Sequence, residues 1–161
     1  MIHSYLFKDI QLVLPNQVVN GDVFIQDGKI QAIGPSLSVS AEQTIADSGL
    51  TLMAGVIDSH VHFREPGATH KETIESGSKA AASGGVTTFF DMPNTNPQTV
   101  TIDALNQKKE IAANTSVVNY NFYIGATLDN LDVLIKAENC PGIKIFMGSS
   151  TGNMLVDDPK I

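Results

Sequence analysis

The chain has 161 residues, 42% of them hydrophobic and 17% charged, and its ten basic and seventeen acidic side chains give a formal charge of −7. A chain of this length can form one domain with a real core. The acidic balance excludes electrostatic binding of nucleic acid, which needs a surface rich in Lys and Arg, and it disfavours anionic membrane surfaces.

The sequence carries no targeting or disulfide signal. No apolar stretch approaches the length of a membrane span, and Met1 to Tyr5 lack the basic and then apolar order of a signal peptide. Cys140 is the only cysteine, which excludes an internal disulfide framework and fits a reducing compartment. We therefore expect a cytoplasmic protein with no nucleic-acid partner and no membrane partner.

The first fifty residues read as a small β unit. Asp27-Gly28 stands between two alternating runs, and both residue types tolerate the positive φ that a two-residue hairpin turn requires. Residues 34–49 are rich in Ser, Gly and Pro, with Ile45 as the main apolar anchor, and they predict a loop or an irregular edge. A first domain is predicted over residues 1–51, with strands at 5–7, 11–14, 22–26 and 29–33.

From Leu52 the pattern changes to strands that alternate with helices. Thr69 and Glu72 have the spacing of a capping box, Gly84-Gly85 ends the first helix, and Thr101 caps a second helix. The predicted strands are 55–64, 86–91, 117–124 and 143–147, and the helices end near 84, 113 and 138. Such alternation predicts an α/β fold with a parallel sheet or a (β/α) barrel over residues 52–161.

The first of these strands has one chemically active face. Because side chains alternate along a strand, Asp58, His60, His62 and Arg64 share one side. Two imidazoles at this spacing can meet one divalent metal ion such as zinc. The alternative is a half-exposed strand whose polar face happens to carry two histidines. Asp58 would either hydrogen-bond to a metal-binding side chain and so orient it, or make a hydrogen bond with a purely structural role.

Two further polar residues follow other strands of the predicted sheet. Asn94 comes after the second strand and Lys144 lies in the fourth, and ligands of parallel α/β folds bind at the carboxyl ends of strands. Lys144 could snorkel from an edge strand. In a buried site its neutral amine could instead add carbon dioxide, and the resulting carbamate could bridge two metal ions. Residues 148–152 would form a loop over this site.

Three motifs together resemble one family. HVHFREPG (60–67), DMPNTNP (91–97) and GIKIFMGSSTG (142–152) are similar to the dihydroorotases of the amidohydrolase superfamily. The resemblance implies the N-terminal part of a metal-dependent (β/α)8 TIM barrel that is preceded by a small β-sandwich segment. Only about four of the eight barrel strands are present, since such a barrel needs about 250 residues.

The same resemblance implies roles for individual residues. His60 and His62 would ligate Zn²⁺, as one or two ions, and a carboxylated Lys144 would be the bridging ligand. Arg64 and Asn94 would hold the carboxylate of the substrate. The implied reaction is the reversible cyclisation of N-carbamoyl-L-aspartate to L-dihydroorotate in pyrimidine biosynthesis.

Part of the implied site has no counterpart in this sequence. The family's later metal-binding histidines and its general base are expected beyond Ile161, so the missing C-terminal half of the barrel is an expected partner. Unpaired sheet edges also favour a homo-oligomer. The alternatives are an allantoinase or hydantoinase, or an inactive dihydroorotase-like fragment with a structural role. Arg64 together with Asn94 favours dihydroorotase among these.

Overall fold

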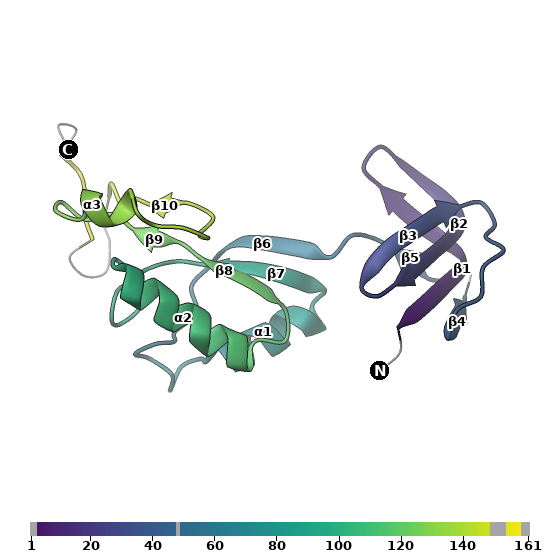
Figure 1. The fold of residues 1–161 in the computed structure, drawn as a ribbon, viewed down its shortest axis with the longest axis horizontal. Coiled ribbons are helices and arrows are strands. Elements are labelled where there is room, and N and C mark those ends of the chain that lie inside the picture. The colour runs from purple at the N-terminus through teal and green to yellow at the C-terminus, as the bar shows by residue number, and fades with distance from the viewer. Residues whose placement is uncertain (1–2, 48, 149–153, 159–161) are drawn as a thin grey trace. The chain divides into compact units, whose positions relative to one another are not determined.

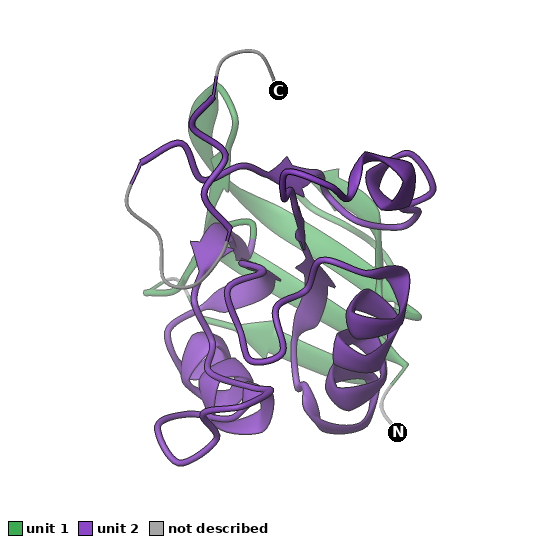
Figure 2. Ribbon diagram, turned by 90° about the vertical axis from the view of Figure 1, so that its left-hand side faces the viewer, with its two compact units in different colours: residues 1–54 green, residues 55–161 purple. Residues whose placement is uncertain are grey.

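A computed structural model describes residues 3–47, 49–148 and 154–158, and the chain divides into two compact units, 1–54 and 55–161 (Figure 1, Figure 2). The boundary predicted from the sequence, between residues 51 and 52, falls inside strand β5 (Thr51–Leu52). Within the described ranges, no helix is long and apolar enough to cross a membrane.

The first unit is a five-stranded sheet. Its strands run in the order β3-β2-β1-β4, with β5 also paired to β1. Asp27 and Gly28 have positive φ angles of 49° and 74° in the turn between β2 and β3, which confirms the predicted hairpin. The remaining bounds are β1 (Ser4–Leu14), β2 (Gln17–Gln26), β3 (Lys29–Gly34) and β4 (Gln43–Ala46).

This unit differs from the prediction in three respects. A single strand, β1, replaces the two predicted at 5–7 and 11–14, because an irregularity between Phe7 and Ile10 is absorbed without ending the strand. The expected loop at 34–49 contains β4, which pairs parallel to β1 and sets Ile45 opposite Phe7. The described residues of this unit also form one five-stranded sheet rather than the two layers of a sandwich.

The second unit is built on parallel strands that follow one another in chain order. Strands β6, β7 and β8 form one parallel sheet, and β9 pairs parallel to β10. Only Tyr123 separates β8 from β9, so the parallel order predicted from strand–helix alternation is confirmed. The strands are β6 (Val56–Val61), β7 (Val86–Asp91), β8 (Asn119–Phe122), β9 (Ile124–Gly125) and β10 (Ile143–Lys144).

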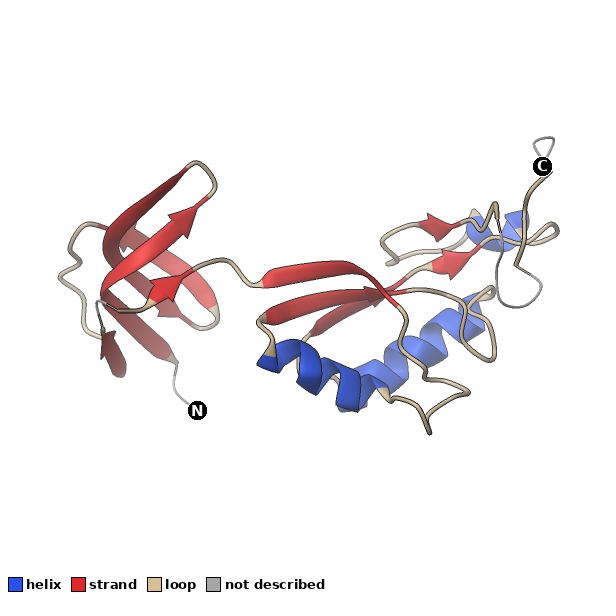
Figure 3. Ribbon diagram, turned by 180° about the vertical axis from the view of Figure 1, so that it is seen from behind, coloured by secondary structure: helices blue, strands red, loops and turns tan. Residues whose placement is uncertain are grey.

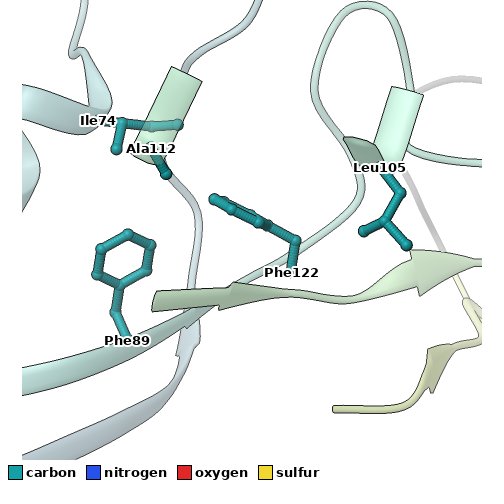
Figure 4. Packing of buried hydrophobic residues seen from close by; sticks show 5 residues of the cluster. All are labelled: Ile74, Phe89, Leu105, Ala112 and Phe122. Carbon is teal, nitrogen blue, oxygen red and sulfur yellow. The ribbon is translucent and has the colours of Figure 1, made fainter. Parts of the chain in front are cut away.

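Two helices cover one face of the β6–β7–β8 sheet, as Figure 3 shows. They are α1 (Ile74–Ser83) and α2 (Ile102–Thr115). Between the helices and the sheet, the apolar side chains of both layers point toward one another (Figure 4). The fully buried members of this cluster are Ile74, Phe89, Leu105, Ala112 and Phe122.

The helix ends test the capping signals. Thr101 caps α2 as predicted, with its side chain accepting from Ala104 N at 3.1 Å. The predicted box at Thr69 and Glu72 is wrong, because Thr73 is the N-cap of α1 and Ser76 completes the box. Glu65 provides the physical reason, since its carboxylate accepts from Ile74 N and fixes the first turn there.

The third helix and the fourth strand are shorter than predicted. Helix α3 (Leu131–Leu134) has only four residues, and its apolar Leu131 remains 67% exposed. A helix this short gains stability mainly from packing, which Leu131 does not supply. Strand β10 ends at Lys144, and the next bridge joins Phe146 to Leu155.

The assignment of the core predicts that the same substitution has different effects on stability at a buried and at an exposed leucine. In the complete protein, Leu105→Ala should lower the free energy of unfolding by about 2–5 kcal/mol, because Leu105 is fully buried and the truncation leaves a cavity. The same substitution at the exposed Leu131 should change it by less than about 0.5 kcal/mol. Denaturant titrations of both variants would check this, and equal losses would contradict the assigned core.

Candidate active site

His60 lies in β6 and His62 directly follows that strand, and their rings lie side by side at its carboxyl end. The ring centroids of His60 and His62 are 5.2 Å apart, the ring planes are tilted by 47°, and both side chains are exposed. The intervening Val61 and the following Phe63 pack against the core of the unit. The predicted alternation of exposed and packed side chains therefore holds only from His60 to Phe63, because Ile57 (61% exposed) and Ser59, both predicted to pack, are exposed. Two imidazoles are left available on one surface.

A hydrogen bond joins the segments that follow β6 and β7. Nδ1 of His62 lies 2.8 Å from Oδ1 of Asn94, which follows β7. Because an amide oxygen only accepts, a neutral imidazole that makes this bond carries its proton on Nδ1 and its lone pair on Nε2. Nε2 is then the nitrogen able to bind a metal ion. This contact was missed from the sequence, although both residues were placed at the ends of adjacent strands.

Arg64 and Asn94 share a pocket of about 470 Å³. Arg64 is exposed and Asn94 is half-buried, so the guanidinium and the amide are both presented at an open surface. Guanidinium and amide N–H groups are donors suited to an anionic oxygen. The pocket is lined by Phe63, Arg64, Pro66, Ala68, Asn94, Thr95, Asn96 and Gln98.

The walls of this pocket are two loops that are tied to each other and to α1. Asn96 N donates to Pro66 O at 3.2 Å, and Glu65 Oε2 accepts from Ile74 N at 2.8 Å. Gly67 has a φ of +99° and lies so close to the backbone of Asn96 that a Cβ there would overlap it. The loop that carries Arg64 is thus tied to α1 through Glu65 and lies close against the loop after β7 at Pro66 and Gly67.

Beneath the loops lies a buried ion pair. Asp91 and Lys108 are both fully buried, and their carboxylate and ammonium are 2.5 Å apart. Burial raises the pKa of Asp91 and lowers the pKa of Lys108, while the attraction between the two groups acts in the opposite direction. Among the described residues, Asp91 Oδ2 has Lys108 as its partner and no hydrogen bond besides.

This pair and the bond from Phe63 N give Asp91 a structural role. The sequence alone does not predict that Lys108 is buried, because Lys108 and Lys109 are adjacent and both resemble solvent-exposed lysines of an amphipathic helix. The signal that could have found it is spacing, because Leu105, Lys108 and Ala112 are the buried residues of α2 and lie on one helical stripe.

Asp58 makes a local hydrogen bond. Its exposed carboxylate accepts from the backbone N–H of His60 at 3.1 Å. Of the two roles considered from the sequence, this contact supports the structural one, since it fixes the backbone that carries His60.

Lys144 lies on β10, the last of the parallel strands, and is half-buried. Its ammonium sits 5.0 Å from the centroid of the Phe146 ring. Across the described ranges, no group of three or more His, Cys, Asp and Glu side chains could hold a metal ion. The two imidazoles of His60 and His62 are by themselves fewer ligands than a zinc site in a protein has. The predicted loop at 148–152 lies outside the described residues after Gly148.

The chain matches one family over most of the second unit. The amidohydrolase family profile matches residues 51–149. An allantoinase of Desulfitobacterium hafniense (strain Y51) is 37% identical over 147 residues, which cover 89% of this chain and 33% of the relative. A dihydroorotase of Methanosarcina mazei is 38% identical over 155 residues, covering 94% of this chain and 34% of the relative.

Solved structures give the same result for the fold. The L-hydantoinase (dihydropyrimidinase) of Arthrobacter aurescens superposes with a TM-score of 0.89 at 33% identity, covering 97% of this chain and 35% of that one. The chain thus spans about a third of the length of the proteins that it matches. The names of these three proteins differ in substrate.

The loop contacts predict a measurable role for Glu65. In the complete protein, Glu65→Ala should destabilise the fold by about 0.5–2 kcal/mol, because it removes the acceptor for the first N–H of α1. Glu65→Gln keeps an acceptor oxygen and should cost less. Thermal unfolding would check both variants against Glu110→Ala, an exposed glutamate in α2. A loss for Glu65→Ala no greater than that of the Glu110 variant would contradict the assignment.

Proposed function

The chain belongs to the amidohydrolase family, and on that basis we propose that the protein to which it contributes is a dihydroorotase. The reaction would be the reversible hydrolysis of L-dihydroorotate to N-carbamoyl-L-aspartate. The observation that carries this choice is the pocket in which Arg64 and Asn94 stand together, beside the two histidines.

Arg64 would select the substrate by its carboxylate. A guanidinium presents a planar fork of donors that matches a carboxylate, and dihydroorotate carries a carboxylate on its ring. Simple hydantoins carry none. Asn94 would add the donor N–H of its amide, while its oxygen keeps His62 in the tautomer described above. One side chain would thus serve both the anion and the imidazole.

The histidines would contribute to a zinc site. His60 and His62 supply two neutral imidazoles on one strand end, and a carbamate on Lys144, derived from carbon dioxide, would add a bridging ligand. When bound, one or two such ions would polarise the amide carbonyl and lower the pKa of a coordinated water. The contribution of this chain is to hold the imidazoles in position and present Nε2 of His62.

Further strands would complete the site. The parallel strands β6 to β10 are too few to close a barrel, and a proton-transferring base for the reaction remains to be supplied. We propose that a C-terminal half of the barrel provides this base and the remaining ligands. The exposed Ile143, Ile145 and Met147 around β10 would be covered in the assembled protein, which we expect to be a cytoplasmic homo-oligomer.

A second candidate is an allantoinase or hydantoinase. It is favoured by the names of the relatives, since an allantoinase and a dihydroorotase are nearly equally similar to this chain. The two candidate substrates differ in the substituent on the ring, which is a carboxylate in dihydroorotate and an uncharged ureido group in allantoin. A non-enzymatic, structural member of the family would bind no metal and turn over neither compound.

Turnover by the complete protein tests the proposal. With zinc and bicarbonate present, kcat/KM should be higher for L-dihydroorotate than for allantoin or hydantoin. Arg64→Met should lower kcat/KM for dihydroorotate about ten- to a hundredfold, since a hydrogen bond to a charged group contributes about 1.5–3 kcal/mol. Turnover of an uncharged cyclic amide should change little.

Lys71→Met is the matched control, because Lys71 is an exposed cation of the same loop that does not line the pocket. Faster turnover of allantoin than of dihydroorotate by the unmodified protein would contradict the proposed substrate. An equal loss for both kinds of substrate in the Arg64 variant would contradict the proposed role of the guanidinium.

A further inference from the structure

The buried ion pair of Asp91 and Lys108 is a costly feature to maintain. Both side chains have no exposed surface, and the apolar cluster that surrounds them includes Phe122, whose ring centroid is 5.0 Å from the ammonium. The desolvation of two charges offsets most of their attraction, so well-packed apolar side chains would often be as stable or more so. Stability alone is therefore a weak explanation for this pair.

Each partner makes a second bond to the backbone beside a residue of the candidate site. Asp91 Oδ1 accepts from Phe63 N at 2.8 Å, and Phe63 lies between His62 and Arg64. Lys108 Nζ donates to Met92 O at 3.0 Å, two residues before Asn94. Helix α2 thus reaches the segments that follow β6 and β7 through a single pair of charges.

The neighbouring backbone bonds converge on the same point. Met92 N donates to Val61 O at 2.9 Å, and Tyr123 N donates to Asp91 O at 3.0 Å. These bonds connect the carboxyl ends of β6, β7 and β8 above the ion pair. With the strand ends aligned in this way, Nδ1 of His62 lies 2.8 Å from Oδ1 of Asn94.

We propose that Lys108 is a positioning residue, which acts with Asp91 to fix the loops after β6 and β7 so that His62, Arg64 and Asn94 meet in one site. Lys108 is bonded to the carboxylate of Asp91 and the carbonyl of Met92, and it acts on the site through them. The consequence for turnover rests on the proposed function, whereas the consequence for loop order does not.

A neutral replacement of the pair separates positioning from stability. The first double variant, Asp91→Asn with Lys108→Met, removes both charges and keeps an acceptor for Phe63 N, but it removes the donor to Met92 O. The second double variant, Asp91→Leu with Lys108→Met, removes both bonds and keeps similar side-chain volumes. The control is Glu75→Gln with Lys79→Met, which neutralises an exposed ion pair of α1 whose charged atoms are 2.6 Å apart.

Two measurements on the complete protein decide the matter: amide hydrogen exchange without substrate, and steady-state kinetics. The first double variant should melt close to the unmodified protein, yet exchange in residues 92–96 should rise about tenfold. In the second double variant, hydrogen exchange should rise by a similar factor in residues 62–68 as well as in residues 92–96. In both, kcat/KM should fall by about a hundredfold, and the control should change neither quantity.

Unchanged exchange and kcat/KM within about twofold in a folded neutral variant would overturn the proposal. Failure of both neutral variants to fold would also overturn it, because the pair would then be needed for folding itself. If the unmodified protein turned over no cyclic amide, the proposed function would fail, and hydrogen exchange alone would decide whether Lys108 orders the loops.

Discussion

The arrangement of the candidate site depends on one interaction, the buried pair of Asp91 and Lys108. Parallel strands bring their carboxyl ends to the same edge, but they do not by themselves fix the loops that follow. The pair supplies that constraint, because its two charges lie beneath the ends of β6 and β7 and are bonded to the backbone of both. The contact between His62 and Asn94, and the pocket beside Arg64, are formed by the loops that these bonds hold.

Much of the fold could be predicted because its signals are local. Strand β7 was predicted with the bounds that the structure has, and Thr101 was identified as the cap of α2, since apolar runs and capping side chains act within a few residues. Strand β4 was not predicted, because it is held by parallel pairing with β1 in a segment rich in Ser, Gly and Pro. The start of α1 was misplaced for a similar reason: it depends on Glu65, nine residues upstream.

The candidate site was only partly predictable from the sequence. Residues with characteristic chemistry, such as His60, His62 and Arg64, are recognisable by type and spacing. Lys108 is not, because a lysine in a helix beside Lys109 resembles a solvated charge. Only the packing of α2 distinguishes them: Lys108 is fully buried, whereas Lys109 reaches the carbonyl of Glu138 at the surface. The residues that hold a site in place are therefore harder to find than those expected to perform its chemistry.

The most direct test of the proposed site is a crystal structure of the complete protein grown with zinc, bicarbonate and L-dihydroorotate. We predict zinc bound to the imidazoles of His60 and His62 at about 2.0–2.1 Å, a carbamate on Lys144 and the substrate carboxylate on the guanidinium of Arg64. An unmodified Lys144 that points away from the histidines, with no metal ion on His60 or His62, would contradict it.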